Sequence, residues 1–143
     1  MILRLNFPFF EVNNQPIIFH RRQLQARDSV TASAIVPAVV EAAGPAAKRR
    51  FVEFFTANIR NRNTRESYLR AVRFFCEWCD ACQFELLHVE PTIVAAYIEE
   101  IQQKYADGSV KVHLAAIRML FDYFVTGGLL PFNPAQAVKG PKL

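Results

Sequence analysis

The fold of this 143-residue chain is decided by the segment SVKVHLAAIRMLFDYFVT, which runs from Ser109 to Thr126. At 100° per residue, apolar side chains cover almost the whole circumference of a helix built from this segment, and Gly127 and Gly128 follow it directly. A helix that is apolar on nearly all sides is typical of the centre of a bundle, where other helices cover it. We therefore predict an all-α fold with this segment as its central helix.

One polar stripe interrupts the apolar surface of the central segment. Its charged members are Lys111, Arg118 and Asp122, and Ser109 and His113 lie near the start of the same helix. The stripe either faces solvent or contacts a partner. For His113 a place in the core is a further alternative, because its helical angle borders the apolar face.

Three further helices are expected around the central one. They span residues 46–58, 64–81 and 91–105. Asn63 and Glu66 have the spacing of a capping box, so we expect Asn63 to cap the second of these helices. Pro91 suits the first position of the third, and Ser109 is expected to cap the central helix.

The regions outside these helices are expected to be less regular. Residues 1–45 form an N-terminal arm, in which the β-prone runs 2–11 and 16–20 either pair as a hairpin or stay loose, with a short helix within 33–43. Residues 46–128 form the helical domain. Residues 129–143 contain three prolines and are expected to form an extended linker with one helical turn near Ala135.

Composition favours one soluble globular domain. Of the residues, 52% are hydrophobic and 13 are Phe, which is enough for a sizeable core. No apolar run has the length of a membrane span, and the N-terminus lacks the pattern of a signal peptide, so we expect a cytoplasmic protein.

Three cysteines, Cys76, Cys79 and Cys82, lie close together on one predicted helix. Their odd number and shared helix make a poor disulfide framework. The C-x2-C-x2-C spacing allows a zinc site with His88 as the nearest fourth ligand, but three sulfurs would have to converge from one helix. Packed thiols are the preferred interpretation, and no metal or other cofactor is predicted.

Charge is segregated along the chain, whose net charge is +4. Residues 48–73 carry eight Lys or Arg against two acids, whereas residues 77–107 carry seven acids against one Lys. A folded bundle then has a positive and a negative side, and the positive side can follow a phosphate backbone. Membrane surfaces and acidic proteins are other partners that this pattern allows.

The start of the predicted 64–81 helix has the residues of a phosphate-binding site. Arg60, Arg62 and Arg65 surround a helix N-terminus, where backbone N–H groups and the helix dipole favour anions. The neutral donors close by are Asn61, Asn63, Thr64 and Ser67. A solvated helix cap is the alternative interpretation.

Two stretches resemble a known family. NTRESYLRAVRFFCEWC, from Asn63 to Cys79, and GSVKVHLAAIRMLFDYFVTGGLLPFNPAQAVKGPK, from Gly108 to Lys142, are similar to the N-terminal core-binding domain of tyrosine recombinases, the phage-integrase-like family. The shared pattern is a helix with a Y…F..WC face, an acidic helix, an L.A.R..F.Y helix and a closing G…NPA..V..PK motif. The resemblance covers about residues 46–142.

The resemblance implies a four- to five-helix, SAM-like orthogonal bundle that forms one jaw of a clamp on duplex DNA at a recombination site. Carried over by position, the residues facing the DNA are Thr64, Ser67, Arg70, Ser109, Val112 and His113. From the residues themselves we add Arg62, Asn63, Arg65, Lys111, Arg118 and Lys142. Val112 and Ala116 carry no hydrogen-bonding group, so contacts with phosphates and with DNA shape are expected to dominate.

No catalytic residue is predicted in this chain. In the family, a Tyr nucleophile assisted by Arg, Lys and His residues acts from a C-terminal domain, which is expected to begin beyond Lys142. The four tyrosines here lie on predicted helices of the bundle without such a constellation. We therefore expect a domain that binds DNA and does not cleave it.

A helical protein-interaction module, using the same surfaces, is the alternative function. One specific expectation is that Phe51, Phe54 and Phe55 pack against a neighbouring protomer of a homo-oligomer if the bundle leaves them exposed. The salt dependence of binding distinguishes the two functions, because binding to DNA phosphates weakens steeply as the salt concentration rises, whereas binding through an apolar protein interface does not.

Overall fold

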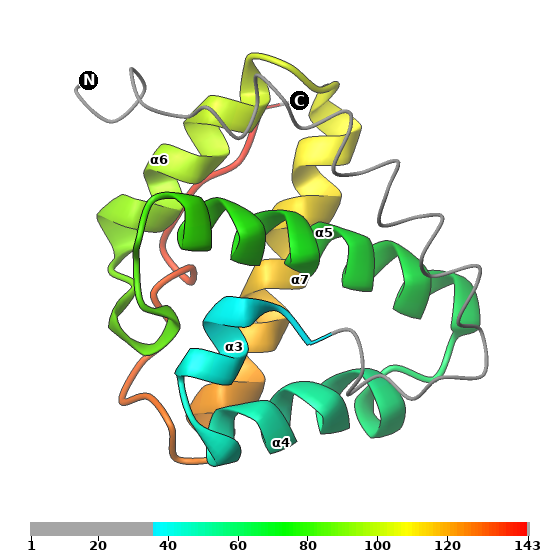
Figure 1. Ribbon diagram of the computed structural model, residues 1–143. Coiled ribbons are helices and arrows are strands. Elements are labelled where there is room, and N and C mark those ends of the chain that lie inside the picture. The colour runs from blue at the N-terminus through cyan, green and yellow to red at the C-terminus, as the bar shows by residue number, and fades with distance from the viewer. Residues whose placement is uncertain (1–35, 143) are drawn as a thin grey trace.

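The computed structural model describes residues 36–142, and within this range the protein is all-α, as the sequence predicts (Figure 1). Its helices are α3 (Ala38–Ala42), α4 (Pro45–Glu53), α5 (Arg62–Ala81), α6 (Pro91–Gln102) and α7 (Asp107–Thr126). A π-helical turn, η3 (Phe54–Asn58), continues α4, and a 3-10 turn, η4 (Leu86–His88), precedes α6. The two β-prone runs lie outside the described residues.

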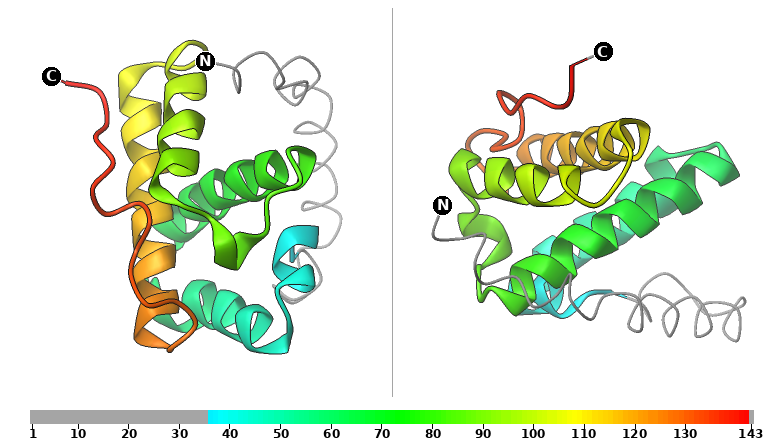
Figure 2. Two further views of the ribbon diagram at one scale, coloured as in Figure 1. Left: turned by 90° about the vertical axis from the view of Figure 1, so that its left-hand side faces the viewer. Right: turned by 90° about the horizontal axis from the view of Figure 1, so that it is seen from above.

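Helix α7 is the centre of the bundle, in contact with α4, α5 and α6. Helix α5 crosses it, α6 lies antiparallel beside its first half, and α4 lies across its C-terminal end (Figures 1 and 2). The buried side chains of α7 point in several directions; the largest are Leu114, Ile117, Leu120, Phe121 and Phe124. The central position follows from this distribution, because each apolar side needs a neighbouring helix to cover it.

The aromatic side chains of α4 and of η3 belong to the core. Phe51 and Phe54 are 0% exposed, and Phe55 is 2% exposed. The Phe55 ring meets the other two edge-on, with centroid distances of 5.1 Å to Phe51 and 4.8 Å to Phe54. The bundle itself covers these side chains, so the condition under which they were expected to contact a neighbouring protomer is not met.

Helix α5 begins two residues earlier than the sequence predicts. Its N-cap is Asn61, whose Oδ1 accepts a hydrogen bond from the Thr64 amide at 3.0 Å. Ile59, just before the cap, is 6% exposed. Because the Ile59 side chain is buried, the chain turns early enough for the helix to begin at Arg62. Asn63, the predicted N-cap, therefore lies inside the first turn.

Helix α7 also begins earlier than predicted, and α6 ends earlier. The residue before α7 is Ala106, and Asp107 supplies a carboxylate in the first turn, at the positive end of the helix dipole. Ser109 therefore lies within the first turn and is not the N-cap. Helix α6 ends at Gln102 rather than near Tyr105, because residues 103–106 are needed to turn the chain into α7.

Two glycines end α7. Gly128 has a φ of +82°, a conformation that favours glycine. The amides of Gly128 and Leu129 donate to the carbonyls of Val125 and Phe124 at 3.0 Å and 2.9 Å, which is the bonding pattern of a Schellman motif. The helix stop expected from the sequence is thus a C-terminal cap.

Arg50 of α4 closes the same end of α7. Its Nη2 donates to the Tyr123 carbonyl at 2.9 Å, its Nη1 lies 3.2 Å from Glu53 Oε1, and its Cζ lies 3.8 Å from the centroid of the Tyr123 ring. A Cβ on Gly127 would lie 2.2 Å from Arg50 Nε, so the glycine leaves the space that this side chain occupies. A cation is favourable here, because the C-terminal end of a helix dipole is negative.

The segment after α7 is packed against the bundle. It runs back along α7 and beside α6 (Figure 2), and Ala135 and Val138 are 0% and 7% exposed. At the other end of the described chain, Val39 and Val40 of α3 join the same core. The core of the described residues therefore extends on both sides of the expected helical domain, residues 46–128.

Asn133 attaches this tail to α7. Its Nδ2 donates to the Arg118 carbonyl at 2.9 Å and to Asp122 Oδ1 at 2.8 Å, and its Oδ1 accepts from the Ala135 amide at 2.8 Å. Where one helical turn was expected near Ala135, residues 134–137 form a hydrogen-bonded turn that is not helix. Three hydrogen bonds from one side chain give the proline-rich tail a defined path, where an extended linker was expected.

Candidate nucleic-acid interface

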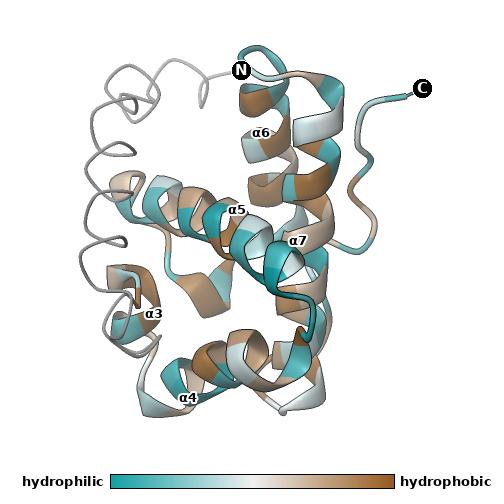
Figure 3. Cartoon of the chain, turned by 90° about the vertical axis from the view of Figure 1, so that its right-hand side faces the viewer, coloured by the Kyte–Doolittle hydropathy of each residue, from teal (hydrophilic) through white to brown (hydrophobic). Residues whose placement is uncertain are grey.

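The start of α5 presents several of the predicted DNA-contacting side chains to solvent. Hydrophilic residues gather at this end of the helix (Figure 3). Asn63, Ser67 and Arg70 are spaced i, i+4, i+7 and therefore share one face. The exposed residues of this region are Arg60, Asn61, Arg62, Asn63, Thr64, Glu66 and Arg70, and Ser67 is half-buried. These residues extend over about 12 Å of helix, at 1.5 Å per residue.

Two of the predicted arginines in this region have different surroundings. The Arg62 side chain is 84% exposed, and its Nε lies 3.7 Å from Glu66 Oε2, a contact that holds it weakly. The Arg65 side chain instead donates to the Ile59 carbonyl from Nε at 3.2 Å and from Nη2 at 3.0 Å, and to the Arg60 carbonyl at 3.4 Å. Arg65 therefore stabilises the turn before α5, whereas Arg62 is available to an anion.

The first turns of α7 carry the second group of predicted residues. Ser109 and Val112 are exposed, Val112 by 38%, and Lys111 is half-buried. Arg70 of α5 lies close enough to this end of α7 to affect the pKa of His113. Phe74, one turn after Arg70 on α5, lies with its ring centroid 5.5 Å from that of His113, so Arg70 is one turn from a contact between α5 and α7. Arg62 lies two turns before Arg70 along α5.

His113 is half-buried in an aromatic environment. Its ring centroid lies 5.5 Å from that of Phe74 and 6.2 Å from that of Tyr105, and Nδ1 lies 3.3 Å from the Tyr97 hydroxyl oxygen. Burial, with the charge of Arg70 as a second cause, lowers the pKa of His113 to about 4. A neutral imidazole packed between rings has the surroundings of a core residue.

Arg118 lies two turns beyond Lys111 on α7, and Lys142 lies on the tail. The Arg118 guanidinium donates to the carbonyls of Ala135 and Val138, so it holds the tail against α7. Lys142 is exposed at the end of that tail. The internal roles of Arg50, Arg65 and Arg118 have no signal in the sequence, because an arginine that binds carbonyls of its own chain follows no local pattern that distinguishes it from one that binds phosphate.

The three cysteines are packed as thiols. Cys76 and Cys79 are 0% exposed, and burial raises the pKa of both thiols well above the ordinary value. Burial raises the pKa of half-buried Cys82 to about 11. His88, the nearest candidate for a fourth zinc ligand, is exposed, with Nδ1 2.6 Å from Glu85 Oε1. Among residues 36–142 no group of three or more His, Cys, Asp and Glu side chains is placed to hold a metal ion.

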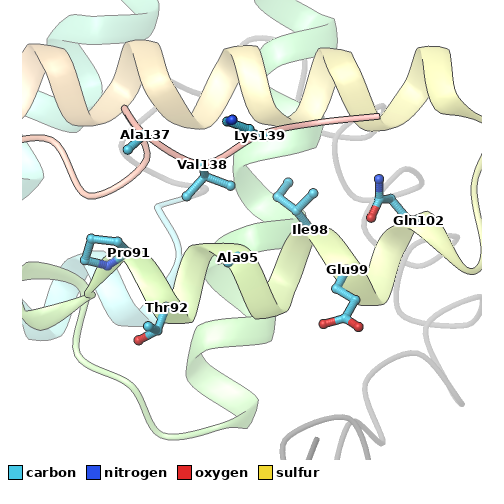
Figure 4. A pocket seen from close by; sticks show the side chains of 9 residues that line it. All are labelled: Pro91, Thr92, Ala95, Ile98, Glu99, Gln102, Ala137, Val138 and Lys139. Atoms are coloured by element: carbon cyan, nitrogen blue, oxygen red, sulfur yellow. The ribbon is translucent and has the colours of Figure 1, made fainter. Parts of the chain in front are cut away.

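A shallow groove lies between α6 and the tail (Figure 4). It has a volume of about 370 Å³. Ala95 and Ile98 of α6 and Val138 of the tail supply apolar lining, and Glu99 and Lys139 add one charge of each sign. None of the predicted DNA-contacting residues lines this groove.

The comparisons with known proteins agree with the fold. Residues 49–127 match the family model described as phage integrase, N-terminal SAM-like domain. Searches of curated proteins and of solved structures gave no match. In the described part of the chain, no helix is both long and apolar enough to cross a membrane. The matched residues make up more than half of the chain and include α5, α6 and α7, and the chain therefore belongs to the family of phage integrase N-terminal SAM-like domains.

Proposed function

We propose that this chain is the DNA-binding core domain of a site-specific tyrosine recombinase, which lies against duplex DNA through the start of α5 and the first turns of α7. The observation that carries the proposal is the exposed, positively charged start of α5, with Arg62 84% exposed and Arg70 one turn from the contact of Phe74 with His113 of α7. Guanidinium groups at a helix N-terminus suit phosphate oxygens, because the dipole and the side-chain charge have the same sign.

The residues predicted to contact DNA fall into two groups, those open to solvent and those bonded inside the protein. We assign DNA contacts to Arg62, Asn63, Thr64, Ser67, Arg70, Ser109 and Lys111, with Lys142 as an additional cation on the tail. For Arg65, His113 and Arg118, the contacts described above favour roles inside the protein. Most of the assigned side chains are phosphate ligands, so binding is expected to be largely independent of sequence.

DNA strand cleavage is assigned to a catalytic domain outside this chain. The family match concerns the SAM-like domain alone. Tyr97 is 0% exposed and burial raises the pKa of its hydroxyl well above the ordinary value, which is unfavourable for a nucleophile. In the full recombinase we expect a cytoplasmic protein that assembles as an oligomer on its recombination site.

The test is the salt dependence of binding to a short fluorescent duplex. We expect a dissociation constant in the range of about 10⁻⁴–10⁻⁶ M at physiological salt, which tightens steeply as salt falls. Arg62→Ala should weaken binding about equally on all duplexes and lower the slope of log K against log[salt] by about 0.9. Lys139→Ala removes the same charge at the groove between α6 and the tail and serves as the matched control. Absence of binding at low salt contradicts the proposal.

A protein-interaction module is the second candidate, and the groove between α6 and the tail is the observation that favours it. A partner that buries the apolar lining of this groove would bind with little dependence on salt. Ala95→Glu places a charge on the lining and should disrupt such a complex, while DNA binding through α5 and α7 should be unaffected. The two candidates therefore respond to different variants.

A further inference from the structure

Three large apolar side chains are exposed in the described part of the protein: Val112 (38%), Met119 (40%) and Phe132 (57%). Val112 differs from the other two in its neighbours. It follows half-buried Lys111 on the first turns of α7, and Ser109, three residues before it, is exposed. An apolar side chain thus stands exposed among residues of α7 that we assign to DNA.

Helix formation does not account for a valine at this position. β-Branched residues lose side-chain freedom in a helix, and a Lys, Glu or Gln would favour both the helix and its solvation. Val112 is also not part of the core, whose α7 members are its neighbours Val110 and Leu114. Its exposed methyl groups are therefore available to a partner.

The shape of α7 around Val112 allows close approach to a partner. Ser109 and Ala115, at i−3 and i+3, lie on the same side of the helix and have small side chains. Met119 stands two turns further along, about 10 Å away at 1.5 Å per residue. Val112 is therefore exposed between two small side chains, on a helix whose diameter of about 10–12 Å allows it to enter a major groove about 12 Å wide.

Within the major groove, an apolar side chain has one specific partner among the four bases. Thymine presents its C5-methyl group there, and apolar side chains distinguish it by direct contact. We propose that Val112 selects a thymine in the recombination site by packing against this methyl group. This inference rests on the proposed function, and it adds a base-selecting contact to a surface otherwise made of phosphate ligands. The positive charges of Lys111 and Arg70 favour DNA over an uncharged apolar partner here.

The experiment removes the methyl group from the DNA and the valine from the protein. Binding duplexes are first selected from a random-sequence pool with the complete chain. Each thymine in the selected duplex is then replaced singly by deoxyuridine, which differs only in lacking the C5-methyl group. At one or two positions the replacement should weaken binding about fourfold, the effect of leaving one methyl group unburied.

The variant Val112→Ala should bind the selected duplex about fourfold more weakly and should lose its sensitivity to deoxyuridine at those positions. Met119→Ala, on the same helix, should keep the sensitivity of the unaltered protein. The inference is overturned if no position responds to deoxyuridine, or if the same positions respond in Val112→Ala. If no duplex is bound at low salt, the proposed function fails together with it. If Val112→Ala keeps its DNA affinity but loses self-association, Val112 contacts protein instead.

Discussion

Replacing Gly127 by Ala tests how α4 is attached to the end of α7. The new Cβ would lie 2.2 Å from Arg50 Nε and 2.7 Å from Arg50 Cζ, so the guanidinium must leave its position. It then loses the hydrogen bond to the Tyr123 carbonyl, which as a charged bond contributes about 1.5–3 kcal/mol. It also loses the contact with the Tyr123 ring, which contributes about 0.5–2 kcal/mol.

The alanine side chain also has a stabilising effect, which opposes the loss of these two contacts. Gly127 has φ −83° and ψ 1°, which alanine adopts without strain. Alanine also restricts the unfolded chain, which stabilises a protein by about 0.4–1 kcal/mol. The partly exposed pair of Arg50 with Glu53 adds little in either direction. Gly127→Ala should therefore lower the free energy of unfolding by about 1–4 kcal/mol.

Urea unfolding, followed by the fluorescence of the single, buried Trp78, measures this change. The decisive comparison repeats Gly127→Ala in an Arg50→Ala background, where the steric conflict is absent. There the same substitution should stabilise the protein by about 0.4–1 kcal/mol. Gly108→Ala, in the first turn of the same helix with nothing within 4 Å of its Cβ, is the control. Equal destabilisation by Gly127→Ala in both backgrounds would refute the reasoning.

Three other predictions concern single sites. His113 has a pKa near 4 in the folded protein and an ordinary pKa near 6.5 when unfolded, so its contribution is constant above about pH 6.5. As the pH falls toward 4, the unfolded state binds more protons than the folded state, and the free energy of unfolding decreases by roughly 2–3 kcal/mol. Urea unfolding measured across this pH range should show the decrease in the unaltered protein and not in His113→Gln. Asn133→Ala should cost about 1–3 kcal/mol and speed proteolysis of the tail, whereas Gln136→Ala, at an exposed position of the same turn, should do neither. Gln83 has a φ of +64°, a conformation that is unfavourable for a residue with a side chain, so Gln83→Gly should raise the urea midpoint by an amount equivalent to about 0.5–1 kcal/mol. Gln103→Gly is the control: Gln103 has a φ of −79°, so glycine there should lower the midpoint.

The features that the sequence predicts well are those with a local cause. The apolar circumference of α7 and the buried face of α5, with Val72, Phe75, Cys76 and Cys79, follow from a period of 3.6 residues, which neighbouring segments do not change. Pro91 marks the start of α6 for the same reason, since a proline restricts its own backbone wherever it lies.

The starts of α5 and α7 were less predictable. The N-cap of α5 is Asn61 rather than Asn63, because the burial of Ile59, a tertiary effect, starts the helix earlier. The N-cap of α7 is Ala106, which has no capping side chain that the sequence could indicate. The charged residues were the least predictable part of the candidate site. Arg118 and Arg65 are polar residues on predicted helix surfaces, and only the packed tail and the turn before α5 give them internal carbonyls to bind.

The attachment of the tail has a mechanical consequence. Arg118 and Asn133 hold it along the side of α7, at positions well before the glycine cap of that helix. A pull on the end of the tail is therefore resisted first by hydrogen bonds loaded in shear, near the middle of α7. The backbone around Gly127 and Gly128, which would otherwise act as a hinge, carries no tension until those bonds break. Force applied to the tail is thus transmitted to the helix at the centre of the bundle.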